Sequence, residues 1–252
     1  MSATPVTLIQ ITDTHIFDEP DGVLGGVNTR QSLQRVLNYI AKHFSDADLL
    51  VLTGDNTHEA TDIAYRALRD MVEPLDIPYT FLAGNHDYEK PMLALSSEEG
   101  DGEIDKWMSV GNWNILLLDS HEEEKVNGRI AQEELEFVDS ILATMEGPVL
   151  AFVHHPLLPV GCAWLDRQRI ANAEEFFSMA RKHQQIKAVV NGHVHQEWSG
   201  EHHGIKLFST PSTCMQFKPN SNDYAEETIA PGFRWFKLYD DGHFETAVVR
   251  VD

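Results

Sequence analysis

Short apolar runs that end in polar residues recur along the chain and have the length of β-strands. They occupy residues 6–12, 49–53, 79–83, 113–118, 149–153 and 187–191. Apolar strands that alternate with helices predict parallel strands covered by helices, and therefore a layered α/β fold. The helical patterns, in which apolar residues recur every three or four positions, comprise Leu33, Val36, Leu37, Ile40 and Phe44; Ile63, Ala67, Leu68 and Met71; and Leu135, Val138, Ile141, Leu142 and Met145.

The last third of the chain has a different pattern. Runs at 205–209, 233–239 and 244–251 follow one another without a helical pattern between them, which predicts a local antiparallel sheet. Asp241-Gly242 separates the last two runs and indicates a hairpin, because glycine tolerates the positive φ that tight turns need. The segment from Glu89 to Lys106, which contains SSEEGDGE, is predicted to be a mobile surface loop.

Length and composition set the limits of the fold. The chain has 252 residues, of which 42% are hydrophobic, enough for a substantial core, and we expect one domain over residues 1–252. No stretch approaches the roughly 18 consecutive apolar residues that a membrane-spanning helix needs, and a basic signal-peptide region is missing. We therefore expect a soluble, cytoplasmic protein. Cys162 and Cys214 are too few for a disulfide framework and are expected to be reduced thiols.

The formal net charge of −21 argues against large nucleic acids and anionic membranes as partners. Binding to both depends on clustered Lys and Arg that neutralise phosphates. An acidic protein that acts on a small anionic phosphate must gather positive charge locally. Bound divalent cations would provide it without basic side chains.

Residues with metal-binding chemistry cluster where the predicted strands end. In open α/β sheets, ligands bind beyond the carboxyl ends of the strands, so we expect these five loops to converge on one site. Glycines in three of the loops allow sharp turns there. Each motif alone occurs by chance in many proteins, and the prediction depends on their conjunction. The motifs are Asp13-Thr14-His15, Gly54-Asp55, Gly84-Asn85-His86-Asp87, His154-His155-Pro156 and Gly192-His193-Val194-His195.

Carboxylates, imidazoles and one amide, with no Cys among them, suit Mn, Fe or Zn better than Ca²⁺ or a thiolate cluster. Seven candidate ligands are too many for one ion. If Asp55 bridges, they divide into two sets of four, which predicts two divalent metal ions about 3.5–4 Å apart. In the histidine pair, the residue nearer the strand, His154, is the expected ligand. The sets are Asp13, His15, Asp55 and His195 for one ion, and Asp55, Asn85, His154 and His193 for the other.

D-x-H, G-D, G-N-H-D, H-H-P and G-H-V-H in this order resemble the calcineurin-like metallophosphoesterase superfamily. The segments LIQITDTHIF, LGGVNTRQS, ILLLDS, LLPVGCAWLD, STPSTCMQFKP and IAPGFRWF further resemble the bacterial class III 3′,5′-cyclic AMP phosphodiesterases, over nearly the whole chain. The resemblance implies a four-layer α/β/β/α sandwich and hydrolysis of 3′,5′-cyclic AMP to 5′-AMP. The expected reaction is attack of a metal-bridging hydroxide on phosphorus.

The resemblance also implies roles for individual residues. His86 occupies the position of the catalytic histidine that is no metal ligand, and it would protonate the leaving oxygen. Asn85 and His15 are expected to contact the substrate as well as metal. The stretch after Asp55 reads NTHEA, where family members commonly carry Leu and then an acidic residue. Either Glu59 or Asp87 is therefore expected to orient His86, and Asp87 counts among the candidate catalytic residues.

Substrate contacts rest on three loop segments, 26–30, 161–164 and 211–214, which we expect to line a nucleotide pocket or else to pack as loops. Asn28 and Arg30 are the candidate substrate contacts. Three alternatives stay open: a broader phosphodiesterase or phosphomonoesterase for 2′,3′-cyclic nucleotides, glycerophosphodiesters or aryl phosphates; a non-catalytic scaffold; and a metal-dependent nuclease, which the charge disfavours. The oligomeric state is open, with a dimer among the options.

Overall fold

The buried side chains of the central strands alternate between two apolar environments. In β4 (Leu49–Thr53), Leu50 and Leu52 belong to one buried cluster, whereas Leu49 and Val51 belong to another. Successive residues of a strand point to opposite faces of its sheet, so such a strand must be covered on both sides. The computed structural model, which describes residues 4–96 and 105–252, shows the covering layers.

Five strands form the first sheet, in the spatial order β15 (Phe244–Arg250), β14 (Gly232–Leu238), β1 (Val6–Ile11), β4 and β5 (Tyr79–Leu82). β1, β4 and β5 are parallel, whereas β14 is antiparallel to both β1 and β15. β14 and β15 form a hairpin in which Gly242 has a φ of 83°. The hairpin predicted at Asp241-Gly242 is therefore confirmed.

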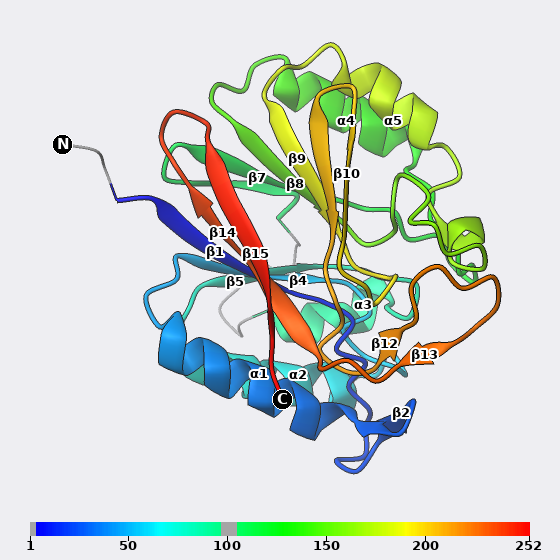
Figure 1. The fold of residues 1–252 in the computed structure, drawn as a ribbon. Helices are drawn as coiled ribbons and strands as arrows, with labels where there is room; N and C mark the ends of the chain where they lie inside the picture. Colours follow the sequence, from blue (N-terminus) through cyan, green and yellow to red (C-terminus); the bar gives the residue numbers. More distant parts are fainter. Residues whose placement is uncertain (1–3, 97–104) are drawn as a thin grey trace.

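Six strands form the second sheet, in the order β10 (Trp198–His202), β11 (Ile205–Ser209), β9 (Ile186–Asn191), β8 (Val149–Val153), β7 (Trp113–Leu118) and β6 (Trp107–Val110). The four inner strands are parallel, and both edge strands are antiparallel to their neighbours. Two short strand pairs lie on the same side of the molecule (Figure 1). They are β2 (Val23–Leu24) with β3 (Val27–Asn28), and β12 (Gln216–Phe217) with β13 (Glu226–Glu227).

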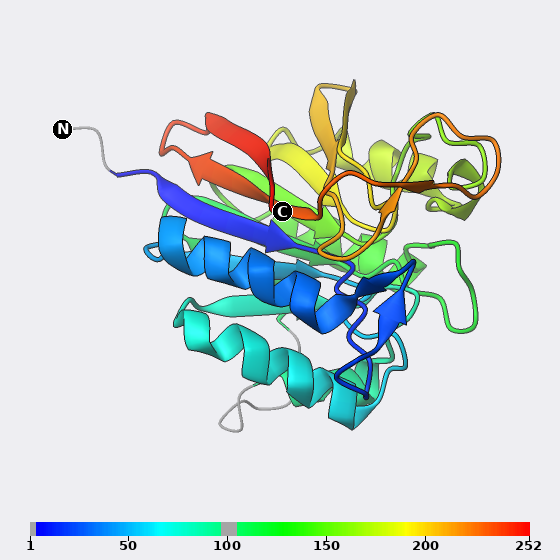
Figure 2. The ribbon, with the colours of Figure 1, turned by 60° about the horizontal axis from the view of Figure 1, so that its bottom comes forward.

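The two sheets stack face to face, and helices cover the outer face of each. Figures 1 and 2 show α1 and α2 along the first sheet, and Figure 1 shows α4 and α5 on the far side of the second. This arrangement confirms the four-layer α/β/β/α fold. The longer helices are α1 (Thr29–His43), α2 (Asp62–Val72), α4 (Gln132–Leu142) and α5 (Ala173–Ala180); the short ones are η1 (Glu73–Leu75), α3 (Glu89–Met92), η2 (Leu93–Leu95) and η3 (Asp166–Gln168).

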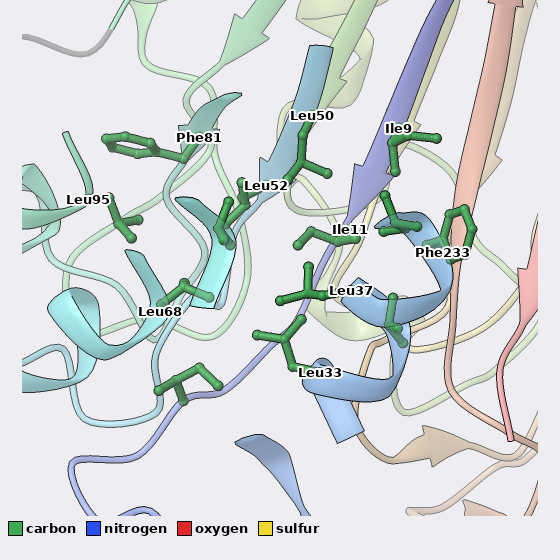
Figure 3. Close-up of a cluster of buried hydrophobic side chains, with 14 of the residues drawn as sticks. Ile9, Ile11, Leu33, Leu37, Leu50, Leu52, Leu68, Phe81, Leu95 and Phe233 are labelled. Carbon is green, nitrogen blue, oxygen red and sulfur yellow. The ribbon is translucent and has the colours of Figure 1, made fainter. Parts of the chain in front are cut away.

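Three apolar clusters hold the layers together. Figure 3 shows the outer cluster of the first sheet, where strand residues such as Ile11 face Leu37 of α1 and Leu68 of α2. A second cluster joins α4 and α5 to the other sheet. The third fills the space between the sheets, where the rings of Phe152 and Phe236 meet edge to face at 6.2 Å. Hydrophobic burial on both faces of each sheet thus fixes where the strand ends lie.

The six predicted strands are confirmed to within a residue at either end. The three helical patterns are confirmed as α1, α2 and α4, although Phe44 and Met145 lie beyond the ends of α1 and α4. The prediction that 205–209 belongs to a local antiparallel sheet was partly wrong, because β11 pairs parallel with β9 in the second sheet. The loop predicted from Glu89 to Lys106 was wrong at its start, where α3 and η2 form. Residues 97–104 lie outside the described part of the chain.

No helix within residues 4–96 and 105–252 has the length and apolar character that crossing a membrane requires.

Replacing Phe236 with Ala should lower the free energy of unfolding by about 3–5 kcal/mol. The Phe236 side chain is fully buried between the sheets, and neighbours on two rigid sheets cannot close the resulting cavity. Urea denaturation measures this change in the free energy of unfolding, provided that both proteins show the same dependence on urea concentration. Ile229→Ala is the matched control, because Ile229 is 49% exposed and should change the value by less than about 0.5 kcal/mol. Equal values for both variants would contradict a packed inter-sheet layer.

Candidate metal centre

The loops that follow β1, β4, β5, β8 and β9 meet at one end of the two sheets and are tied to one another by backbone hydrogen bonds. The Asp13 N–H donates to the Gly54 carbonyl at 3.0 Å, and the His15 N–H donates to the Asp55 carbonyl at 2.9 Å. The His193 N–H donates to the Asp13 carboxylate at 3.0 Å. Parallel strands bring their carboxyl ends to the same edge, and these bonds then set the spacing of the loops.

The backbone conformation of these loops is unusual. Asp13, His15, Asp55, His193 and His195 have φ values of 52°, 45°, 48°, 63° and 47°. Non-glycine residues seldom adopt this left-handed region, and it costs roughly 1–3 kcal/mol per residue. The conformation turns each side chain toward the common centre instead of along the strand direction.

Two glycines leave room for the side chains at the centre. A Cβ on Gly54, whose φ is 90°, would lie 2.4 Å from His154 Nδ1. A Cβ on Gly84 would lie 2.2 Å from Asp55 Oδ1. Gly84 is therefore needed for close packing, and not for the sharp turn that the sequence suggested.

The first predicted ligand set lies together in the structure. Asp13 Oδ1 is 3.3 Å from His195 Nε2, and Asp55 Oδ2 is 3.7 Å from His15 Nε2. The two imidazole nitrogens, His15 Nε2 and His195 Nε2, are 3.4 Å apart. All four residues are at most 3% exposed.

The second set adjoins the first through Asp55. The other oxygen of this carboxylate, Oδ1, is 3.4 Å from His154 Nε2, so the two oxygens of Asp55 face the two sets, as a bridging ligand would. The ring of His193 lies 5.2 Å from that of His154. Asn85 follows on the loop after β5, and its Oδ1 is buried without a hydrogen-bond partner among the described residues.

Outer hydrogen bonds select which ring nitrogen of each histidine is free. A carbonyl oxygen only accepts, so His154 Nδ1 must donate to the Thr53 carbonyl at 2.8 Å, and His195 Nδ1 to that of Met215 at 2.8 Å. In their neutral form both rings then present Nε2 to the centre as a lone pair, the arrangement typical of metal-binding histidines. His193 instead donates its Nε2 proton to Gln168 Oε1 at 3.1 Å, which leaves Nδ1 as its free lone pair.

These residues fit a pair of cations. Two atoms that bind one ion at about 2.0–2.2 Å lie about 3.3–3.6 Å apart in tetrahedral geometry, which is close to the separations of 3.3–3.7 Å at both sets. His154 Nε2 and Asn85 Oδ1 are buried and have no hydrogen-bond partner in the described residues. Buried polar atoms normally have partners, and a cation would supply one.

Electrostatic interactions hold the two aspartates ionised. Burial opposes ionisation of Asp55, but His154 outweighs it and the pKa of Asp55 lies well below its usual value. The pKa of Asp13 is lowered as well, because His195 and His154 counter its burial. Burial also disfavours a charged His154, yet Asp55 raises its pKa to about 9. By contrast, burial lowers the pKa values of His15 and His193 to about 3.

His86 lies beside this centre, but neither expected acidic residue orients its ring. His86 Nδ1 is 3.3 Å from the His58 carbonyl oxygen. The Glu59 carboxylate accepts a hydrogen bond from the Asp18 N–H. Asp87 accepts from the N–H of Gly84, Asn56 and Thr57, the Asn56 side chain and the Tyr65 hydroxyl, at 2.7–3.3 Å. Asp87 therefore joins two loops to α2, which corrects its expected contact with His86.

Asn28 and Arg30 serve the loop in which they lie. Asn28 caps α1 by accepting from the Gln31 N–H at 2.8 Å and donates to the Pro20 carbonyl at 3.1 Å. Arg30 Nη2 donates to the carbonyls of Phe17 and Asp18, both at 2.8 Å. These bonds give both side chains a structural role in the loop, and their contact with the substrate stays a prediction. Cys162 and Cys214 are free and buried, as predicted.

Sequence reasoning missed three residues that position functional side chains of the site. His58, Gln168 and Tyr65 contact His86, His193 and Asp87 respectively. Only His58 had a signal, because it falls in the NTHEA stretch that departs from the common pattern.

The sequence of residues 6–197 matches the family model described as calcineurin-like phosphoesterase. The chain belongs to this family. Among curated family members, the 3′,5′-cyclic adenosine monophosphate phosphodiesterase CpdA of Escherichia coli K12 is 37% identical over 247 residues, which cover 98% of this chain and 90% of that protein. CpdA of Pseudomonas aeruginosa is 34% identical over 257 residues, which cover 100% of this chain and 94% of that protein.

Solved structures of calcineurin-like phosphoesterase type share the fold. A dimetal phosphatase from Danio rerio superposes with a TM-score of 0.71 at 17% identity, covering 99% of this chain and 100% of that one. Purple acid phosphatase PPD1 of yellow lupin gives 0.68 at 13% identity, covering 100% of this chain and 55% of that one. At such identities the likeness concerns the fold alone.

Cation binding should release protons, and its affinity should rise with pH up to about 9. In the cation-free protein Asp55 keeps a proton on His154 up to a pKa of about 9, and a cation needs the lone pair that this proton occupies. Titration calorimetry with Mn²⁺ at pH 7.5, in two buffers of different ionisation enthalpy, should show release of about one proton. An apparent enthalpy that is the same in both buffers would contradict this.

Proposed function

We propose that the chain hydrolyses 3′,5′-cyclic AMP to 5′-AMP with two divalent cations, Fe, Mn or Zn. The observation that carries the proposal is the similarity to cyclic AMP phosphodiesterases, which covers 98–100% of this chain and 90–94% of those proteins. The contacts among Asp13, His15, Asp55, His154, His193 and His195 support it. A scaffold that had lost catalysis would have no reason to retain the strained loops and buried charges of this centre.

Asp13, His15, Asp55 and His195 would hold one cation, and Asp55, Asn85, His154 and His193 the other. When bound, the pair supplies Lewis-acid stabilisation of the phosphoryl oxygens and activates water as a nucleophile. The protein contributes rigidity, because each ligand is oriented by an outer hydrogen bond or by a loop contact. Preorganised charge of this kind dominates catalysis of phosphoryl transfer.

His86 is the proposed general acid. Its N–H donates to the Asp55 carboxylate at 2.9 Å, which fixes its backbone at the centre. Because Nδ1 donates to the His58 carbonyl, Nε2 is left to deliver a proton to the leaving 3′ oxygen. Asn85, the preceding residue, would also face the phosphate from this loop.

An aromatic cluster next to His195 supports a nucleotide as the substrate. The ring of Phe217 stacks on His195 at 4.4 Å, and Trp164 meets Phe217 edge on at 4.8 Å. Tyr224 lies 5.4 Å from Trp164 and is 59% exposed. Exposed aromatic rings stack on nucleobases, so this cluster offers a purine a surface beside the metal centre.

The purified protein should cleave 3′,5′-cyclic AMP to 5′-AMP after chelation and readdition of Mn²⁺, Fe²⁺ or Zn²⁺. We expect kcat/KM of about 10⁴ M⁻¹s⁻¹ or more, the lower range of dedicated enzymes. 2′,3′-Cyclic AMP and a glycerophosphodiester are assayed alongside. Asp55→Asn, which keeps the shape but removes the bridging charge, is the inactive control. Faster cleavage of another ester would favour the broader phosphodiesterase.

His86→Ala should keep both cations and lose about 10²- to 10⁴-fold in kcat, the usual contribution of a general acid. Metal content by mass spectrometry and steady-state kinetics measure the two effects separately. Loss of the metals, or unchanged turnover, would exclude His86 as the acid.

A further inference from the structure

The side chain of His58 packs against two other rings at the edge of the metal centre. Its ring is 4.3 Å from that of Phe17, at 30°, and 5.0 Å from that of His86, at 24°. His58 is half-buried and follows Asp55 by three residues. The proposed general acid thus packs face to face on a residue of the β4 loop.

Hydrogen bonds fix the backbone that carries these rings. The His58 N–H donates to the Ile16 carbonyl at 3.0 Å, which joins the β4 loop to the loop after β1. Phe17 is the next residue on that loop, and Arg30 binds its carbonyl at 2.8 Å. Gly22 lies against Phe17 so closely that a Cβ there would be 2.4 Å from Phe17 Cβ. The outer ring therefore cannot move away easily.

Of Glu59, Asp87 and His58, only His58 is in contact with the ring of His86. The His58 carbonyl accepts the Nδ1 proton, and the His58 ring limits rotation of the His86 plane. Asp87 and Glu59 use their carboxylates elsewhere. His58 Nδ1 itself is buried and has no hydrogen-bond partner among the described residues, so the contact between the His58 and His86 side chains is one of ring against ring.

We propose that His58 is a positioning residue that holds the His86 ring in its protonating orientation by stacking, with Phe17 as its backing. This rests on the proposed function of His86 as the general acid. Misplacement of a reacting group by about 1 Å can cost about 10²-fold in rate, so a stack that fixes one ring plane has a measurable effect on kcat.

The test compares His58→Ala, which removes the stack, with His58→Phe, which keeps a flat ring without nitrogen atoms. We expect kcat for cyclic AMP to fall about 10- to 100-fold in the Ala variant, with KM and the metal content unchanged. The Phe variant should stay within about 3-fold of the parent, and Phe17→Ala should reproduce part of the loss. His43→Ala is the matched control. The His43 ring also lies on an aromatic ring, that of Tyr39 at 4.3 Å, but His43 is the last residue of α1 and not part of the loops that form the centre.

A second readout needs no turnover. Long-range ¹H–¹⁵N spectra of histidine-labelled, zinc-loaded protein report the tautomer of each ring, and the signal missing from His86→Ala assigns His86. We expect a fixed Nδ1–H of His86 in the parent and in His58→Phe, with Nε2 also protonated in the acid form that donates to the leaving oxygen, and averaged signals in His58→Ala. If the parent fails to cleave cyclic AMP, the proposed function fails, yet these spectra still test the orientation of His86.

Three results would overturn the role of His58. Unchanged kcat and spectra in His58→Ala would show that the stack is dispensable. A Phe variant as impaired as the Ala variant would show that the ring nitrogens matter. Zinc inhibition that disappears in His58→Ala, with a third zinc ion per parent chain, would make His58 a metal ligand together with His15 and His86, whose nitrogen atoms lie within 4.8 Å of one another.

Discussion

The site depends on holding strained backbone at the ends of parallel strands. Asp13, His15, Asp55, His193 and His195 all have left-handed φ values, a conformation that costs roughly 1–3 kcal/mol each. Such strain persists only where the surroundings over-determine it. Here the loops are bonded to one another, and the strands beneath them are packed on both faces by apolar side chains. The four layers therefore act as the rigid support that keeps the ligands pointing inward.

The second constraint is the concentration of charged groups in a buried site. Two aspartates and several imidazoles share the centre with almost no water access, and burial alone would neutralise carboxylates. The cation-free protein solves this by leaving a proton on His154, whose pKa rises to about 9 next to Asp55. Bound cations would take the place of that proton. They would supply the site with positive charge, through which a chain with a net charge of −21 could accept a phosphate.

The sequence was sufficient where the information is local and periodic. The run 49–53 coincides with β4, and the polar residues after each run lie at the strand ends as predicted. It was insufficient where the outcome depends on a distant partner. Nothing in residues 205–209 shows that β11 pairs in parallel with β9 in addition to its local antiparallel pairing with β10. For the same reason the sequence does not reveal that the guanidinium of Arg30 binds two carbonyls of its own loop.

The loop from Gly84 to Asp87 shows how two neighbouring residues of one motif can divide their tasks. Asp87 points inward, and five donors from three segments stabilise its charge although burial raises its pKa. Its carboxylate is fully used in holding the loop and has no lone pair to spare for a ring outside. His86 faces the opposite way, toward the centre, and must be oriented by something else. A backbone carbonyl and a stacked ring do this without adding another negative charge beside Asp55, where like charges would weaken the ionised state of both carboxylates.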